Sequence, residues 1–221
     1  IMSSDWSSDV CSSDLESRTA LARGQAVGHP HTQAYVAYYA AVLAALEGAF
    51  DEAAAHAERC LALCEAHGFE QWRGLARALI GIAELARHPD RDAERVGAVR
   101  ALLAGYQRSG YQLGMTVLYA VLAALLLRLG WRENAAELVE AGLAVVERND
   151  ERIFEAELHR LAAAVRVTAT DPAMAAEADA ALRRGTDVAR AQGAHQLERR
   201  CRRDARRLAA ATRRSEEHTS E

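Results

Sequence analysis

Residue types that bind metals recur along one short segment of the chain. His56, Cys60, Cys64 and His67 are separated by four, four and three positions, so on a helix they share one stripe. Thiolate and imidazole are the usual zinc ligands. A helix rises about 1.5 Å per residue, so the outer two lie about 16 Å apart and one ion could take only an adjacent pair. We expect Cys60 and Cys64 to be buried packing residues and no metal to be bound, because free cysteine behaves as a small hydrophobe.

A second arrangement with chemical potential is the pair Glu155 and His159, four residues apart on an expected helix. The spacing would suit an acid/base pair, but no nucleophile or oxyanion-donor motif accompanies it. All 27 basic residues are arginine and none is lysine. This excludes a lysine-containing phosphate loop and Schiff-base chemistry on this chain. We therefore expect no catalytic residue, no cofactor site and a non-enzymatic segment.

Aromatic and polar residues on the first helix of each expected helix pair could line a recognition groove. Packing is the expected role of Tyr38, Tyr39, Trp72 and Tyr119, since aromatic side chains dominate the cores between paired helices. The candidates for groove contacts with a protein partner or a small-molecule effector are Arg73, Arg77, Tyr119 and His159.

One concentrated cluster of positive charge precedes the C-terminal end. It consists of Arg199, Arg200, Arg202, Arg203, Arg206 and Arg207. Such a cluster could bind nucleic acid through its phosphates. An apolar stripe through Leu197, Cys201, Ala205 and Leu208 instead predicts a capping helix, and no aromatic residue is interleaved for base stacking. A solvated outer face, or a contact with an acidic neighbouring domain, is the preferred interpretation.

An internal repeat predicts the elements that carry these residues. A shift of 82 residues aligns Gly48 with Gly130, and the alanines and glutamates that follow each glycine also match. Helix stops at about 40-residue intervals predict two helices per repeat. The expected hairpins are 29–68, 69–110, 111–150 and 151–193, followed by a capping helix over 194–211. We therefore predict an all-α fold, an α-solenoid of about four tetratricopeptide-like hairpins with a C-terminal capping helix over 16–213.

Both ends of the chain resemble translated sequencing-adapter DNA. A coding sequence for RSEEHTSE at 214–221, read on its opposite strand, encodes SDVCSSDL at 8–15. We expect 1–15 to be an adapter-derived, disordered tail, 214–221 to be adapter-derived as well, and the chain to be a fragment of a longer protein. Without these ends, 26 arginines face 25 acidic residues, so no charge bias indicates nucleic acid or membrane.

The repeats resemble a known protein region. The resemblance rests on HPHTQAYVAYYAAVLAAL and AERCLALCEAHGF within 29–69, on GWRENAAELVEAGLAVVERNDERIFEAELHRL at 130–161 and on EADAALRRGTDVARAQGAHQLE at 177–198. These strings resemble the tetratricopeptide-like helical repeat region that follows the ATPase module of large bacterial signalling proteins, of the adenylate or guanylate cyclase type or the transcriptional-regulator type. The resemblance covers nearly all of 28–211.

The resemblance implies a regulatory binding arm that performs no catalysis itself and is joined to an upstream ATPase module. A free-standing repeat scaffold and a helical enzyme domain are the alternatives. The apolar stretch at 113–127 is too short for a membrane span, so we expect a buried helix there and no membrane contact. Residues 1–15 lack the basic start and apolar core of a signal peptide, and four cysteines fit a reducing cytoplasm.

Overall fold

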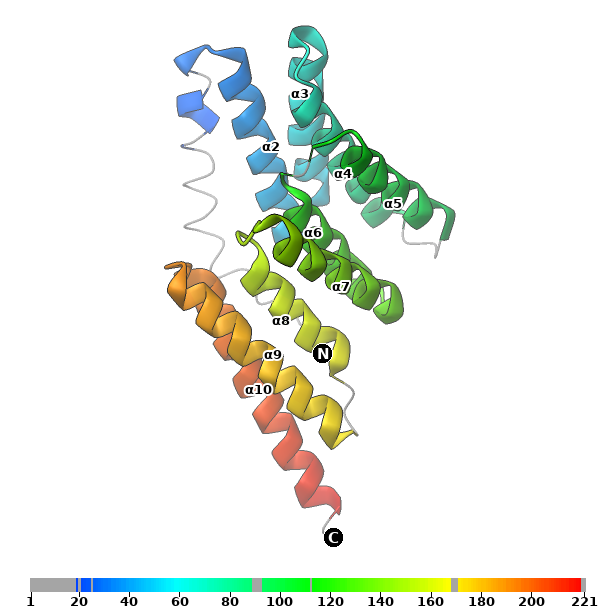
Figure 1. Cartoon of the computed structure of the whole chain (residues 1–221), viewed down its shortest axis with the longest axis vertical. Coiled ribbons are helices and arrows are strands. Elements are labelled where there is room, and N and C mark those ends of the chain that lie inside the picture. The colour runs from blue at the N-terminus through cyan, green and yellow to red at the C-terminus, as the bar shows by residue number, and fades with distance from the viewer. Residues whose placement is uncertain are drawn as a thin grey trace. The chain divides into compact units, whose positions relative to one another are not determined.

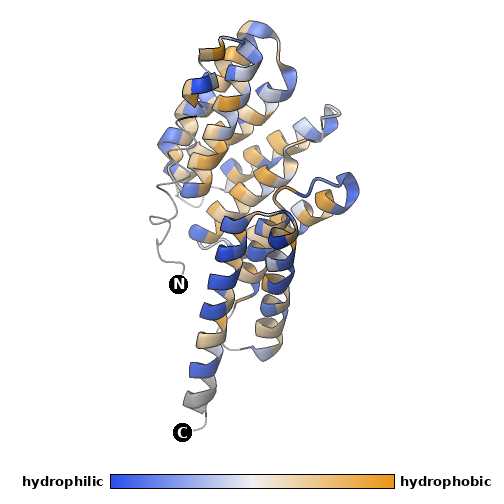
Figure 2. Ribbon diagram, turned by 90° about the vertical axis from the view of Figure 1, so that its left-hand side faces the viewer, coloured by the Kyte–Doolittle hydropathy of each residue, from blue (hydrophilic) through white to orange (hydrophobic). Residues whose placement is uncertain are grey.

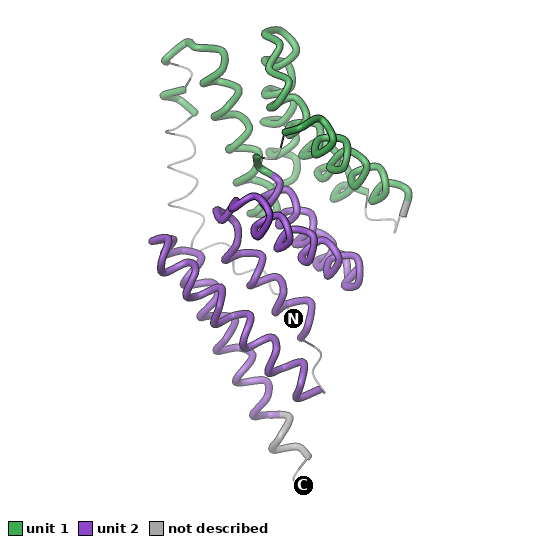
Figure 3. Tube along the Cα trace, in the orientation of Figure 1, with its two compact units in different colours: residues 1–114 green, residues 115–221 purple. Residues whose placement is uncertain are grey.

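The computed structural model describes residues 19, 21–24, 26–88, 93–111, 113–167 and 171–219. Within these ranges every regular element is a helix, and the helices pack in consecutive pairs (Figure 1). The predicted all-α, helical-repeat fold class is therefore confirmed. The expected disordered tail over 1–15 lies outside the described residues. The chain divides into two compact units, 1–114 and 115–221 (Figure 3).

The first unit contains two helix hairpins. The first pairs α2 (Pro30–Glu47) with α3 (Phe50–His67), and the second pairs α4 (Glu70–Arg87) with α5 (Ala93–Arg108). Helix α2 also packs against α4, so the first helices of consecutive hairpins are neighbours. The sequence predicted these two hairpins at 29–68 and 69–110.

The second unit contains two more hairpins and a closing helix. These helices are α6 (Met115–Arg128), α7 (Arg132–Asn149), α8 (Glu155–Arg166), α9 (Pro172–Ala191) and α10 (His195–Thr219). Helix α10 packs on α9 and α8, as a cap would. Its backbone stays helical eight residues beyond the expected end at 211, through a segment rich in the helix formers arginine and glutamate.

The turns show why the hairpins begin and end where they do. Gly48 and Gly130, which the repeat aligns, both adopt the left-handed backbone conformation, at φ 82° and 81°. The following amides, Ala49 N and Trp131 N, donate to carbonyls five residues back at 2.8 Å. Residues other than glycine rarely adopt this backbone conformation. Glycine therefore ends α2 and α6, the first helices of their hairpins.

Small residues let the helices of each unit approach closely. Ala53 and Ala135, also aligned by the repeat, are both completely buried. At Gly142 on α7, an added Cβ would lie 2.8 Å from a methyl carbon of Leu158 on α8. At that distance something must shift, so a side chain at this position would displace the buried Leu158 side chain from its packing between the helices.

Among the described residues, no helix is both long enough and apolar enough to span a membrane.

Candidate functional site

Aromatic side chains from α2 and α4 cluster in the first unit. The Trp72 ring on α4 lies 5.3 Å from Tyr38, 5.5 Å from Tyr35 and 6.4 Å from Tyr39, measured between ring centroids. Tyr38 and Trp72 are buried, which agrees with a packing role. The Tyr35 ring, 4.7 Å from Tyr39, is 45% exposed. The cluster thus begins in the core and reaches the surface.

Two histidines and a phenylalanine extend the cluster. The Trp72 indole Nε1–H donates a 3.0 Å hydrogen bond to Nε2 of His31, the exposed first-turn histidine of α2. His31 also meets the Phe69 ring edge-on at 5.2 Å, and His67 stacks on Phe69 at 5.7 Å. We call this surface of the first unit the aromatic surface; its residues are His31, Tyr35, Tyr39, His67, Phe69 and Trp72.

Arg73 and Arg77, two of the predicted groove residues, pair with acidic neighbours. Arg73 forms an ion pair with Glu70 one turn earlier, and Arg77 Nη2 lies 3.3 Å from Glu65 Oε1 on α3. All four side chains are at least one-third exposed. Arg73 and Arg77 therefore pair with carboxylates of α4 and α3.

The other two predicted groove residues, Tyr119 and His159, belong to the second unit. Tyr119 on α6 is half-buried and faces α7. A Cβ added to Gly142 on α7 would lie 3.1 Å from the Cβ of Tyr119. His159 on α8 lies beside α9, with its Cβ 3.3 Å from the position of an added Cβ on Gly185. The four predicted residues are thus divided equally between the two units.

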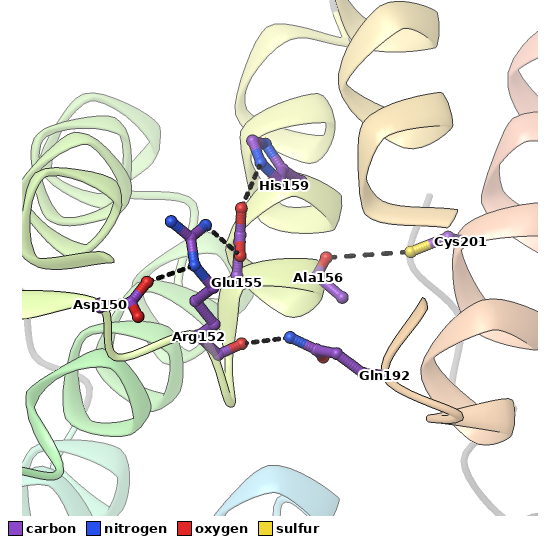
Figure 4. A network of polar contacts seen from close by, with 7 residues as sticks. All are labelled: Asp150, Arg152, Glu155, Ala156, His159, Gln192 and Cys201. Carbon is purple, nitrogen blue, oxygen red and sulfur yellow. Dashed lines mark hydrogen bonds and ion pairs between the residues drawn. The ribbon is translucent and has the colours of Figure 1, made fainter. Parts of the chain in front are cut away.

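His159 is part of a polar network at the start of α8 (Figure 4). Arg152 donates hydrogen bonds from Nε to Asp150 Oδ1 at 2.6 Å and from Nη1 to Glu155 Oε2 at 3.1 Å. The other carboxylate oxygen of Glu155 lies 3.9 Å from His159 Nε2, and Gln192 donates to the Arg152 carbonyl at 2.8 Å. The network ties the turn before α8 to the end of α9.

The environment of His159 does not suit proton transfer to a bound substrate. Its side chain is only 15% exposed and that of Glu155 only 10%. Burial lowers the pKa of His159 below its usual 6.5, which the Glu155 carboxylate offsets only in part. The printed partners of Glu155 are His159 on α8 itself and Arg152 in the preceding turn, so the contacts of this pair hold the start of α8.

A buried ion network joins α8 to α10 in the second unit. Arg160 donates to both carboxylate oxygens of Glu157, at 2.9 and 2.7 Å, and to Asp204 Oδ2 at 2.9 Å. Burial by itself would raise the pKa of Glu157, but the charge and hydrogen bonds of Arg160 outweigh it and hold that pKa below its usual value. The sequence analysis did not find this network, because oppositely charged residues three apart are common on exposed helix faces.

The cysteine–histidine stripe lies on α3. Cys60 and Cys64 are buried with their sulfur atoms 3.9 Å apart, whereas His56 is half-buried and His67 is exposed. Burial raises the pKa of both thiols, which disfavours the thiolate that a metal requires. In the described part of the chain, no group of three or more potential ligands is placed to hold a metal.

The arginine cluster lies on α10, the largely hydrophilic helix that ends at the C-terminus in Figure 2. Cys201 and Leu208 on the apolar stripe are buried, while Arg202, Arg206 and Arg207 are exposed. Arg202 also pairs with Glu198 one turn earlier, at 2.9 Å. The side chains thus divide into a packed stripe and a solvated face, the arrangement that a capping helix requires.

Sequence reasoning missed His31 and Tyr35 as surface residues. A signal was present, because Tyr35 and Tyr39 are one helical turn apart and His31 is one turn before them. The rule that aromatic residues fill the cores of helix pairs holds for Tyr38 and Trp72, which are buried. It does not hold for Tyr35, which is exposed.

No protein-family model matches the chain, and no curated protein matches it either. Function is therefore inferred from the geometry of the described residues and from the resemblance of the repeats.

Proposed function

We propose that this chain is a regulatory binding arm, a helical-repeat fragment of a multidomain bacterial signalling ATPase that performs no catalysis itself. The observation that carries the binding role is the aromatic surface of the first unit. It spans the first helices of two consecutive hairpins, α2 and α4, and is anchored in the core by Trp72. Tyrosine and tryptophan dominate binding hot spots because they bury a large area at a small entropic cost.

The arrangement of these side chains favours recognition over simple packing. Tyr35 leaves nearly half of its surface exposed although its ring contacts Tyr39 and Trp72. A ring held by two neighbours is already ordered, so a partner that covers it loses little further conformational entropy. Polar groups on His31 and Tyr35 can fix the orientation of a bound protein segment or small effector.

The placement within a signalling ATPase rests on the resemblance of 28–211 to the repeat regions of such proteins. In that setting, the arm would act in the bacterial cytoplasm and report binding to an ATPase module on the same polypeptide. The arm contains no lysine, so the phosphate-binding lysine of that module must lie outside it.

A display selection of peptides against the full chain tests the binding role. Peptides selected on the wild-type chain should fail to bind the Tyr35→Ala variant and should still bind the Leu102→Ala variant. Leu102 on α5 is a matched control, because it belongs to the same unit and is 40% exposed. A selection that enriches no peptide sensitive to Tyr35→Ala would overturn the proposed surface.

A further inference from the structure

Helix α10 has one face that consists almost entirely of arginine. This face lies on the side of the helix opposite to the buried residues Cys201 and Leu208, and we call it the arginine face. Arg203 is half-buried, and the other arginines of the face are exposed. The residues of the face are Arg199, Arg202, Arg203, Arg206, Arg207, Ala210 and Arg213.

Contacts with α8 fix the rotation of α10 about its own axis. Asp204 accepts a 2.9 Å hydrogen bond from Arg160, and the Cys201 thiol lies 3.9 Å from the carbonyl oxygen of Ala156. Leu208 is buried on the same side of α10. The helix cannot turn its arginine face inwards without breaking these contacts, so the face is held towards the solvent.

The charge of the arginine face is largely uncompensated. Along its length the only acidic residue in the sequence is Asp204, which binds Arg160 on the packed side of the helix. Arg206 and Arg213 form no ion pair or hydrogen bond with any described residue. Arg206 also lies one turn after Arg202, and like charges at this spacing repel each other. An anionic partner would relieve this repulsion.

We propose that the arginine face binds an acidic segment of a protein, whose carboxylates pair with the exposed guanidinium groups. Arginine suits this partner because its planar guanidinium can donate two parallel hydrogen bonds to one carboxylate. The face belongs to the second unit, so this inference adds a second binding surface to the proposed aromatic surface of the first.

The dimensions of the face indicate the size of the segment. From Arg199 to Arg213 the face is about 21 Å long, because a helix rises about 1.5 Å per residue. About four turns of an acidic helix cover this length. Glutamates or aspartates at every third or fourth position of such a helix would form a row that matches the row of arginines.

A protein segment suits the face better than nucleic acid does. Nucleic acids favour broad basic surfaces, on which many phosphates lose their counterions. Helix α9, which packs on α10, carries three arginines and three acidic residues and therefore does not extend the basic surface. No aromatic residue is interleaved with the arginines for base stacking. The basic area is a single narrow row, which one peptide segment can cover.

Fluorescence anisotropy of a labelled acidic peptide mixed with the full chain tests the proposal. The probe is a helical peptide of about 15 residues with glutamate at every third or fourth position, which spans the arginine face. We expect saturable binding of this peptide and no binding of a peptide with glutamine in place of each glutamate. Binding should weaken as the salt concentration rises from about 0.05 to about 0.5 M, because salt screens exposed ion pairs.

A charge reversal locates the binding on the helix. Arg206→Glu should weaken binding at least about fivefold, because it removes an ion pair and places a like charge against the peptide. The matched control is Arg148→Glu, which changes the net charge equally at an exposed arginine of α7 in the same unit. This control should bind like the wild type. Circular dichroism establishes that both variants remain folded.

Absence of binding, or equal binding of the glutamine peptide, would overturn the proposal. So would equal losses in Arg206→Glu and Arg148→Glu, because net charge alone would then explain them. A DNA duplex of about 15 base pairs, or vesicles of anionic lipid, that bound more tightly than the peptide would overturn the acidic segment as the partner. Tyr35→Ala should leave the affinity for the peptide unchanged, so failure of this proposal and failure of the aromatic surface are distinguishable.

Discussion

Arg160 on α8 and Asp204 on α10 are 44 residues apart in sequence and are joined by a 2.9 Å hydrogen bond from Nη1 to Oδ2. The same guanidinium binds Glu157 through its other two nitrogens, Nε and Nη2, so one side chain links the last hairpin to the closing helix. The side chains of Arg160 and Glu157 are 6% and 1% exposed. A charge that lost its partner there would have little access to water.

We predict that Arg160→Met lowers the free energy of unfolding by about 3–5 kcal/mol, because it leaves the buried Glu157 carboxylate unpaired. Urea denaturation at neutral pH measures this loss. The matched control is Arg166→Met on the same helix, whose pair with Glu177 is largely exposed and should contribute less than about 1 kcal/mol. Equal losses in the two variants would contradict the assignment. Adding Glu157→Gln to Arg160→Met should recover part of the loss.

Stability should fall on mild acidification because of two histidines. Burial lowers the pKa of His56 and of His159 below 6.5. Below that pH the unfolded chain binds protons that the folded chain does not, so this stabilisation is complete above about pH 6.5 and declines as the pH falls. We expect His56→Gln together with His159→Gln to flatten the decline in unfolding free energy. An unchanged pH profile would show that these pKa shifts do not occur.

The cysteines of α3 should behave as packing residues. We expect purified protein to carry no stoichiometric zinc, and chelation to leave the helical circular dichroism intact. Cys60, Cys64 and Cys201 should react with a thiol reagent only slowly until urea unfolds the chain, because all three are buried and burial raises the pKa of Cys201 to about 12. One tightly held zinc per chain would refute the packing interpretation.

The repeat arm should neither bind nor hydrolyse ATP. Residues 16–213 contain no lysine and no glycine-rich phosphate loop, which a nucleotide-binding module of the proposed kind requires. Calorimetry with ATP and magnesium should therefore show no binding by this segment. Measurable turnover would favour the helical enzyme domain, and an intact reading frame that contains only repeats would favour the free-standing scaffold.

The sequence predicted the hairpins well because their signals are local. Gly48 and Gly130 end helices through their own backbone freedom, and the Asp171 carboxylate accepts a 2.9 Å hydrogen bond from the Ala173 amide, as an N-cap before Pro172 should. Each of these features depends on a few neighbouring residues.

The sites were less predictable because they depend on packing between helices that are distant in sequence. Arg160 meets Asp204 only when α10 closes on α8, and no local pattern encodes that contact. Tyr35 and Tyr38 are the same residue type on the same helix, yet one is 45% exposed and the other is 1% exposed. The difference depends on which side of α2 faces the neighbouring helices. Because α2 is almost uniformly hydrophobic around its circumference, its sequence does not indicate that side.

The central claim, that the aromatic surface of the first unit binds partners, is tested most directly by the affinity of a selected peptide for three forms of the full chain. Isothermal titration should show that Tyr35→Ala weakens binding at least about tenfold, or about 1.4 kcal/mol, as expected when a hot-spot ring is removed. Leu102→Ala should bind like the wild type. Equal affinity of all three forms would contradict the claim.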